Sequence, residues 1–229
     1  MRIAVIPARG GSKRIPRKNI REFAGKPIIA WPIKVALESE LFDKVVVSTD
    51  DDEIAQVSLR FGAAVPFVRP SNLADDFSDT KAVVRHAISE LGLERDFASQ
   101  VCCIYPTSVF ITPEYLACGL DLLNVQKCQF TLSITGVDSR VLRSFTQDAA
   151  GKLKMVFPEN YNQRTQDLSP LYCDAAQFYW GSVSAWQSNE PLFSENSRGV
   201  FIDSSRVSDI DTDVDWSSAE AIYQLIKGG

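Results

Sequence analysis

The chain has 229 residues, of which 45% are hydrophobic and 23% charged, a composition typical of a globular protein and not of a disordered one. The formal net charge of −5 argues against a general nucleic-acid binder, and no apolar run approaches the ~20 residues that a membrane span needs. Five cysteines without CxxC spacing argue against a disulfide framework or a zinc site, and they favour a reducing, cytoplasmic location. The single histidine, His86, rules out chemistry that needs several.

Basic residues gather at the N-terminus. Residues 1–26 hold eight basic residues and one acidic residue, so this segment carries +7 in a chain that is acidic overall. Such a short basic island suits a small polyanion, because a long nucleic acid would meet repulsion beyond it. A solvated basic loop is the alternative interpretation.

The first half of the chain alternates between strand and helix patterns. The predicted elements in chain order are a strand over 3–7, a loop over 8–19, a helix over 27–38, a strand over 44–48, a helix from Asp50 to Phe61, a strand over 64–68, a helix over 80–91, a strand over 101–105 and a helix that begins at Thr112-Pro113-Glu114. Gly62 and Gly92 follow two of these helices, where glycine commonly ends a helix.

The second half is less regular. It contains predicted strands over 130–135, 177–182 and 199–202, and a closing helix over 217–227. Between about 138 and 173 the pattern breaks, with a strand-like run over 152–157 and no strong helix, so we expect either a flap or an arm used for dimerisation. The alternation predicts one α/β domain over 1–229, with a mostly parallel twisted sheet covered by helices on both faces.

The loop after the first predicted strand carries the strongest functional signal, with the sequence IPARGGSKRIPRKN over 6–19. Ligands of open α/β sheets bind at the carboxyl ends of the strands, where this loop lies. Gly10 and Gly11 would let backbone N–H groups approach an anion closely. The side chains that could hold the anion are Arg9, Ser12, Lys13 and Lys18. The glycine spacing matches neither common phosphate-binding pattern, so the loop predicts a triphosphate site of another type.

Two further motifs contain polar residues that admit two interpretations each. Asp209 and Asp211 would present two carboxylates on one face of an extended segment, which suits Mg²⁺ beside phosphate oxygens, although a solvated acidic turn is the alternative. The stretch over 69–80 could recognise a nucleobase or only hold a loop, and it also provides a helix start at Asp79 or Thr80.

Around residue 177 the sequence DAAQFYW occupies positions 174–180. Strand alternation would place Gln177 and Tyr179 on one face and Phe178 and Trp180 on the other. Gln177 could therefore face a sugar hydroxyl or simply pair with a neighbouring strand.

Taken together, these motifs resemble the CMP-sugar synthetases, the cytidylyltransferases that act on nonulosonic acids. The resemblance spans nearly the whole chain: IPARGGSK at 6–13, VVVSTDD at 45–51, RPSNLADD at 69–76, YPTS at 105–108 and DIDT at 209–212. It implies a Rossmann-like nucleotidyltransferase fold and a homodimer formed through the inserted arm. It also implies CMP transfer from CTP to the anomeric hydroxyl of a nine-carbon acidic sugar with Mg²⁺, which releases pyrophosphate.

The resemblance also assigns roles by position. Arg9, Gly10, Gly11, Ser12 and Lys13 would hold the CTP phosphates, Lys18 would stabilise the α-phosphate, Asn19 would contact the nucleotide, and Arg69, Ser78 and Thr80 would lie around the cytosine. Asp209 and Asp211 would coordinate the metal. Arg164, Gln166 and Asp167 fall where the arm reaches toward the sugar. We expect Lys18, Arg9 and Asp211 to carry the catalysis, with a metal-bound water or a carboxylate such as Asp211 as the base.

Two departures from the sialic acid synthetases fall at the expected sugar pocket. Tyr105 stands where those enzymes usually carry Gln, and the stretch over 174–180 replaces their usual Asn-Gly-Ala. With the KRIPRKNI stretch at 13–20, the changes resemble the branch that acts on pseudaminic acid. N-Acetylneuraminate and legionaminate remain alternative substrates, and the Kdo branch ranks lower. Alternatives of other classes are a non-catalytic sugar-nucleotide sensor and a GT-A glycosyltransferase, although the latter would carry its acidic pair in mid-chain.

Overall fold

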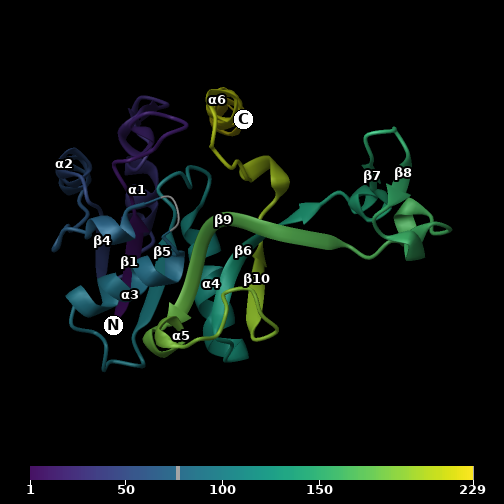
Figure 1. Ribbon diagram of the computed structural model, residues 1–229. Helices are drawn as coiled ribbons and strands as arrows, with labels where there is room; N and C mark the ends of the chain where they lie inside the picture. The colour runs from purple at the N-terminus through teal and green to yellow at the C-terminus, as the bar shows by residue number, and fades with distance from the viewer. Residues whose placement is uncertain (76–77, 229) are drawn as a thin grey trace.

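The computed structural model describes residues 1–75 and 78–228, and at its centre is a six-stranded sheet in the order β10-β6-β9-β5-β1-β4 (Figure 1). The strands are β1 (Arg2–Pro7), β4 (Lys44–Ser48), β5 (Gln100–Ile104), β6 (Phe130–Val137), β9 (Leu171–Ser182) and β10 (Ser197–Phe201). Strand β1 runs parallel to β4 and β5, and β10 runs parallel to β6. Because only β9 is antiparallel to its neighbours, the expected mostly parallel sheet is confirmed.

Helices cover both faces of this sheet, as predicted. Helices α1 (Ala30–Glu38), α2 (Asp52–Arg60) and α4 (Pro113–Gln126) share one hydrophobic cluster, whereas α3 (Thr80–Glu90) and α5 (Val183–Gln187) share the other. In β1 the side chains alternate between the two clusters, with Ala4 and Ile6 in the first and Ile3 and Val5 in the second. This period of two places an apolar layer on each side of a single strand.

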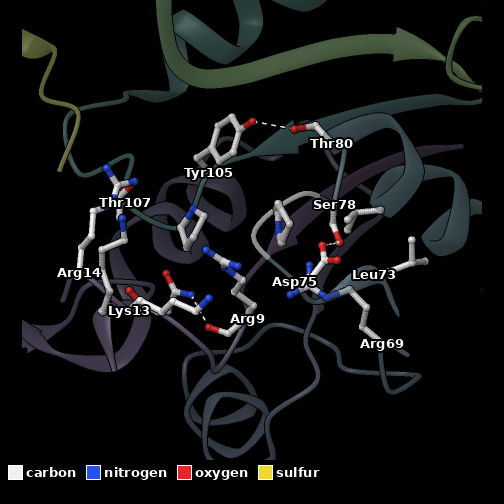
Figure 2. Close-up of a pocket in the computed structure, with 16 residues that line it drawn as sticks. Arg9, Lys13, Arg14, Arg69, Leu73, Asp75, Ser78, Thr80, Tyr105 and Thr107 are labelled. Carbon is white, nitrogen blue, oxygen red and sulfur yellow. Dashed lines mark hydrogen bonds between the residues drawn. The ribbon is translucent and has the colours of Figure 1, made fainter. Parts of the chain in front are cut away.

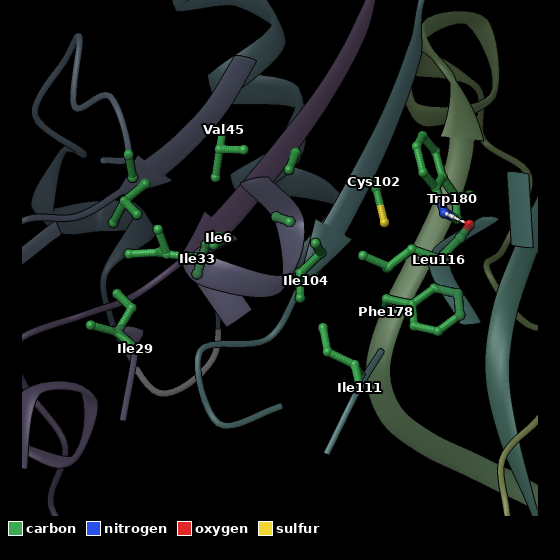
Figure 3. Packing of buried hydrophobic residues seen from close by; sticks show 14 of the residues in the cluster. Ile6, Ile29, Ile33, Val45, Cys102, Ile104, Ile111, Leu116, Phe178 and Trp180 are labelled. Carbon is green, nitrogen blue, oxygen red and sulfur yellow. Dashed lines mark hydrogen bonds between the residues drawn. The ribbon is translucent and has the colours of Figure 1, made fainter. Parts of the chain in front are cut away.

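The cluster under α1 and α4 is shown in Figure 3, where Ile6, Ile33 and Ile104 converge between sheet and helices. Trp180 is fully buried in it, and its indole N–H donates to the Leu116 carbonyl at 3.1 Å. Full burial of an aliphatic side chain such as Ile6 or Ile33 stabilises the fold by ~1.5–3 kcal/mol. The indole also needs its hydrogen bond, because an unsatisfied buried donor would offset part of that gain.

Local features of the sequence fix the ends of several helices, and α2 begins at Asp52, two residues later than expected. The Asp51 carboxylate caps α2 by accepting from the Ile54 N–H. Gly62 and Gly92 follow α2 and α3 with φ of +93° and +67°, a left-handed conformation that favours glycine. Pro113 occupies the first turn of α4, directly after Thr112.

Some predicted boundaries are wrong. No strand forms over 64–68, where Ala64 and Val68 make only isolated parallel bridges to Val46 and Thr49. Pro66 lies between the two bridges, and a proline cannot donate to a strand ladder. The first helix begins at Ala30 and not at Pro27, because Pro27 pairs with Glu22 in a small hairpin formed by β2 (Glu22–Phe23) and β3 (Lys26–Pro27). The last helix, α6 (Asp213–Gly228), begins four residues earlier than expected.

A third hydrophobic cluster lies apart from the two sheet faces and joins distant parts of the chain. Ile15 and Phe23 from the N-terminal region pack there with Ile210 and with Trp216 of α6. The guanidinium of Arg21 stacks 4.5 Å from the centre of the Trp216 ring and pairs with Asp213. The cluster therefore fastens the loop after β1 to the segment that carries the late aspartates.

The irregular region between β6 and β9 forms an arm that projects from the body of the molecule (Figure 1). Its elements are η3 (Ser139–Arg143), β7 (Phe145–Gln147), β8 (Leu153–Met155), η4 (Pro158–Asn160) and η5 (Thr165–Asp167). Because Val137 of β6 pairs with Leu171 of β9, the arm is an insertion at the tip of an antiparallel hairpin.

No helix in the described part of the chain is both long and apolar enough to cross a bilayer.

Candidate functional site

A pocket of about 550 Å³ lies at the carboxyl ends of β1 and β5, where the sequence places the candidate ligand loop (Figure 2). Three segments line it: the loop over 8–19, hereafter the phosphate loop; the stretch before and into α3; and the turn after β5. Among the predicted site residues, those that line the pocket are Arg9, Ser12, Lys13, Lys18, Asn19, Arg69, Ser78, Thr80 and Tyr105. Residues from three separate parts of the sequence thus face one cavity. Asp76 and Phe77, which belong to the second segment, lie outside the described residues.

Positive charge dominates this pocket. Five cationic side chains line it, namely Arg9, Lys13, Arg14, Lys18 and Arg69, while Asp75 is the one acidic lining residue that the structure describes. In Figure 2 the Arg9 guanidinium points into the middle of the cavity. Such a concentration of cations in a concave site attracts anions of several charges, as a nucleoside triphosphate has.

The phosphate loop is held by contacts within the protein. The Asn19 side-chain amide donates to the Arg9 carbonyl at 2.9 Å, which ties the end of the loop to its beginning. The Gly10 N–H donates to the Asp50 carboxylate at 3.0 Å. A Cβ at Gly10 would lie 2.6 Å from an Asp51 oxygen, so the close approach requires glycine. In this structure Asp50 accepts from the Gly10 N–H, whereas a Cβ at Gly11 would meet open space, and the role of both glycines in holding phosphates stays a prediction.

Arg69 is a buried cation whose donors are not all satisfied. Its side chain is 4% exposed, and in the described structure neither Nε nor Nη2 has a hydrogen-bond partner. Its Nη2 lies 3.7 Å from Asp50 Oδ1, and burial lowers the pKa of Arg69. Unsatisfied buried donors are costly unless a ligand completes them, so Arg69 is suited to recognising acceptor atoms of a bound molecule.

The late aspartates lie beside the phosphate loop, as the sequence hypothesis requires. Lys18 Nζ donates to the Ile210 carbonyl at 2.7 Å and lies 3.3 Å from Asp211 Oδ1. Arg14 Nη1 pairs with the other oxygen of Asp211 at 2.7 Å. These contacts bring together segments more than 190 residues apart in the sequence.

The donor set at this point fits a magnesium ion that shares its coordination with phosphates. Burial, and then the charge of Asp211, raise the pKa of Asp209, so the two carboxylates lie within each other's field. No group of three or more metal-ligating His, Cys, Asp or Glu side chains occurs in the described residues. Mg²⁺ does not need one, because it commonly takes one or two carboxylates and completes its shell with phosphate oxygens and water.

Tyr105 forms the wall at the far side of the pocket. Its hydroxyl shares a 2.8 Å hydrogen bond with Thr80 Oγ1, and burial raises the pKa of Tyr105 to about 12 (Figure 2). Its ring meets Tyr179 edge-on, with ring centres 5.6 Å apart, and the Tyr179 hydroxyl donates to Asp174 at 2.5 Å. Both phenols are therefore neutral and locked in place at neutral pH.

A second cavity, of about 460 Å³, lies on the other side of Tyr179. Asp174, Phe193 and Arg198 are among its lining residues, and the Phe193 ring lies 6.3 Å from that of Tyr179. The cavity combines exposed aromatic surface with both signs of charge. The sequence places the 174–180 stretch at the expected sugar pocket but does not identify Asp174 as a lining residue. The position of Asp174 depends on how β9 pairs with β6 in the folded chain.

The remaining predicted sugar residues lie elsewhere. Gln177 is 4% exposed, donates to the Arg206 carbonyl at 2.7 Å and lines neither cavity, and its main-chain carbonyl accepts from Tyr105 N–H. Its main chain pairs with the neighbouring segment, as one interpretation expects, while its side-chain Oε1 is buried without a hydrogen-bond partner in the described structure, so its contact with a sugar stays a prediction. Arg164, Gln166 and Asp167 lie in the arm, where Arg164 donates to Asp167 at 2.6 Å, and they line neither cavity of their own chain.

Comparison with known proteins agrees with this geometry. A family model described as cytidylyltransferase matches residues 3–215. The chain is 38% identical to the pseudaminic acid cytidylyltransferase of Campylobacter jejuni over 223 residues, which cover 97% of this chain and 96% of that protein. It is 35% identical to the CMP-N,N'-diacetyllegionaminic acid synthase of Legionella pneumophila, with 97% and 96% covered.

A solved structure shares the fold at much lower sequence identity. The structure of CMP:2-keto-3-deoxy-manno-octonic acid synthetase complexed with CTP superposes with a TM-score of 0.73 at 16% identity and covers 98% of both chains. The expected nucleotidyltransferase fold is thereby confirmed. With the family match over nearly the whole chain and the two relatives above, we conclude that this protein is a nucleotidyltransferase and belongs to the cytidylyltransferase family.

Proposed function

We propose that the protein transfers CMP from CTP to the anomeric hydroxyl of a nonulosonic acid, most specifically pseudaminic acid, and yields the CMP-sugar and pyrophosphate. The observation that carries the proposal is the contact of Lys18 with Asp211 at the rim of a pocket lined by five cations. The names of the relatives support the sugar class, since two act on pseudaminic acid and diacetyllegionaminic acid.

The two cavities suggest how the substrates divide between them. The cationic pocket would take the triphosphate and cytidine, with Arg69 offering its buried donors to the base. The second cavity would take the acidic sugar, because Arg198 can pair with a carboxylate while Phe193 covers apolar substituents. Tyr105 and Tyr179, between the two, would then border the point where the substrates meet.

The reaction follows from charge and position. The acceptor hydroxyl oxygen attacks the α-phosphorus, the bond from that phosphorus to the pyrophosphate oxygen breaks, and the hydroxyl proton is released. Transfers of this kind depend mainly on alignment and on neutralising the charge that develops on phosphate oxygens. Lys18 is held by Ile210 and Asp211 so that its ammonium borders the pocket, and Arg9 points into it. Asp211 is the candidate carboxylate to accept the proton.

Magnesium belongs to the proposal as the cofactor. Asp209 and Asp211 would hold Mg²⁺, which, when bound, neutralises phosphate charge. Asp211 now pairs with Arg14 and Lys18, and if it held the ion instead, both cations would be available to the phosphates.

A homodimer built through the arm also belongs to the proposal. The arm carries exposed apolar side chains, including Phe145 at 58%, Leu153 at 63% and Tyr161 at 71% exposure, which a second copy of the chain could cover. In that arrangement Arg164, Gln166 and Asp167 would reach a sugar bound by the partner.

We further propose a cytoplasmic location, which the five unpaired cysteines support.

A panel assay tests the function. The protein is incubated with CTP, Mg²⁺ and, in separate reactions, pseudaminic, legionaminic and N-acetylneuraminic acids, and pyrophosphate release is measured. We expect the highest kcat/KM with pseudaminic acid. A higher value with another sugar corrects the substrate. CTP binding without turnover on any sugar refutes the proposed activity and favours a sugar-nucleotide-binding protein.

A further inference from the structure

We propose that Asp51 and Arg17, hereafter the clamp, position the phosphate loop for CTP without contacting the nucleotide. The inference rests on the proposed function, because it assumes that the loop holds the phosphates of CTP. Neither residue lines the pocket, although Arg17 belongs to the basic motif. The clamp is thus a candidate for a residue pair that acts on the reaction through the shape of the loop.

The clamp has the geometry of a strong ion pair. Arg17 Nη1 donates to Asp51 Oδ2 at 2.5 Å, and Nη2 donates to Oδ1 at 2.9 Å. Two parallel hydrogen bonds fix both the distance and the orientation of the guanidinium. Since Asp51 Oδ1 also accepts from the Ile54 N–H at 3.0 Å, the carboxylate is anchored to the first turn of α2. The loop is therefore fastened to a rigid helix.

The backbone at Arg17 shows what the clamp holds. Arg17 has φ of +54°, a left-handed conformation that is uncommon for residues other than glycine. The next residue, Lys18, begins the short helix η1 (Lys18–Ile20). A change of conformation at Arg17 would turn Lys18 away from Ile210 and Asp211, which its ammonium now contacts. The clamp thereby sets the direction of the proposed catalytic lysine.

The other end of the loop rests on the same carboxylate. A Cβ at Gly10 would lie 2.6 Å from Asp51 Oδ2, so the backbone at Gly10 packs closely against the clamp. The neighbouring Asp50 accepts from the Gly10 N–H. The two consecutive aspartates after β4 thus hold the start of the loop, while Asp51 also holds its end through Arg17.

The positive charge of Arg17 is already paired with carboxylates of the protein itself. Its guanidinium pairs with Glu53 at 2.5 Å as well as with Asp51, so two carboxylates that do not line the pocket neutralise it. Loss of the clamp should therefore weaken CTP binding through misplacement of the loop. Loss of Glu53, whose side chain is 67% exposed, should have little effect because the two bonds to Asp51 remain.

The test uses four variants of the full chain: Asp51→Asn, Arg17→Gln, the double variant and the matched control Glu53→Gln. Asparagine can still cap α2, so Asp51→Asn removes the charge and leaves the cap. Binding of CTP and of cytidine is measured by calorimetry, together with kcat, KM and the melting temperature. We expect each single clamp variant to bind CTP about 10-fold to 100-fold more weakly, since small misplacements cost this much. Cytidine, which lacks phosphates, should change less than about threefold, as should the control.

Non-additivity gives a second readout. Because the two residues act as one unit, the double variant should bind CTP no worse than the weaker single variant. Wild-type affinity for CTP in Asp51→Asn overturns the inference. So does a loss confined to Arg17→Gln, which would make Arg17 a direct phosphate ligand. Equal losses for CTP and cytidine with a lower melting temperature also overturn it, because they indicate a general folding role. Failure of the proposed function is separate: it appears as a wild-type protein that turns over no sugar.

Discussion

At the scale of single residues, the basic N-terminal segment divides into two kinds of cation. Arg9, Lys13, Arg14 and Lys18 line the pocket, where the last two also contact Asp211. Arg17 and Arg21 do not line it and pair with carboxylates at the start of α2 and α6. A count of charges treats all of these residues alike, yet only the cations that line the pocket can bind a ligand there. The other cations hold the protein around the pocket in its shape. The excess of positive charge in this segment therefore reflects both ligand binding and positioning of the loop.

The first prediction concerns Lys18. Replacement by alanine removes the ammonium that borders Asp211 and should lower kcat about 100-fold to 1000-fold, as loss of one charge-stabilising donor commonly does. CTP affinity should change much less, because four other cations line the pocket. Pyrophosphate release gives kcat, and calorimetry gives the dissociation constant of CTP.

Lys34→Ala is the matched control, since Lys34 is half-exposed on α1 and pairs only with Glu38 among the ion pairs of the described chain. Near-normal turnover by Lys18→Ala would remove Lys18 from the catalytic set. An equal loss in both variants would point to damage unrelated to the site.

What the sequence could predict at this scale depends on whether a residue acts locally. Asp51 as a helix cap and Gly62 as a helix end follow from their immediate neighbours. The role of Gln177 does not, because alternation along a strand gives the face but not what covers it. Its carboxamide meets the Arg206 carbonyl from a distant segment, and that contact exists only in the folded chain.

At the scale of elements, the junction of α3 and α5 is held by two cations, one buried and one half-buried. Lys81 is 7% exposed, its ammonium donates to the Ser188 and Glu190 carbonyls at 2.9 and 2.5 Å, and it lies 5.1 Å from the Phe130 ring centre. Arg85 donates to the Trp186 carbonyl from the next turn. These two side chains satisfy carbonyls in the last turn of α5 and just after it, and a helix as short as α5 is not stable by itself.

The second prediction tests this junction. Lys81→Met keeps much of the side-chain volume but removes the donor to the Glu190 carbonyl and one of the two donors to the Ser188 carbonyl, which Arg85 also contacts, so the free energy of unfolding should fall by about 2 kcal/mol. Urea unfolding measures the change, with Lys34→Met as a control expected within about 0.5 kcal/mol of wild type. The KM for CTP should be unchanged, because Lys81 does not line the pocket. Unaltered stability would show that water replaces the ammonium.

The proposed role of the arm in dimerisation can be tested by removing the arm. Since Val137 pairs directly with Leu171, residues 138–170 can be replaced by Asn-Gly, which forms a tight two-residue hairpin turn. The third prediction is that this shortened chain folds and binds CTP but is monomeric, whereas the full chain runs at twice its mass of 25.4 kDa. Light scattering after gel filtration gives the masses. A dimeric shortened chain, or a monomeric full chain, would reject the arm as the dimer contact.

Prediction of elements from the sequence succeeded where the hydrophobic period was long and failed where tertiary pairing decided. Most strands of the sheet, and the presence of helices on both of its faces, were predictable. The strand expected over 64–68 was not formed because Pro66 interrupts its pairing with β4. The antiparallel direction of β9 was also not predictable, since an apolar run has no direction. The third cluster, around Trp216, joins segments too far apart for periodicity to connect.

At the scale of the whole molecule, two segments from opposite ends of the chain make one site. The phosphate loop comes directly after β1, and the late aspartates precede α6, yet Lys18 and Arg14 reach Asp211. The family pattern predicted that these segments meet. The structure shows what holds the two segments together, because Ile15 from one and Ile210 from the other are both fully buried in the third hydrophobic cluster. Ligand binding at this joint should therefore stabilise the entire fold.

The last prediction follows from that joint. CTP with Mg²⁺ at about 100 times its dissociation constant should add about 2.7 kcal/mol to the free energy of unfolding. For a chain of this length that corresponds to a rise of about 5–10 °C in Tm, measurable by calorimetry or dye-based melting. Removal of the metal with EDTA should reduce the rise, because triphosphate and the late carboxylates then repel each other across the joint.

Asp211→Asn is the informative variant for this experiment. Its Tm rise with CTP should be nearly the same with and without Mg²⁺, since one of the two proposed metal ligands is neutral. UTP is the control ligand: it carries the same phosphates, so a smaller rise than with CTP measures recognition of the base by residues such as Arg69. An equal rise in EDTA for the wild-type protein would disprove the metal site, and an equal rise with UTP would disprove recognition of cytosine.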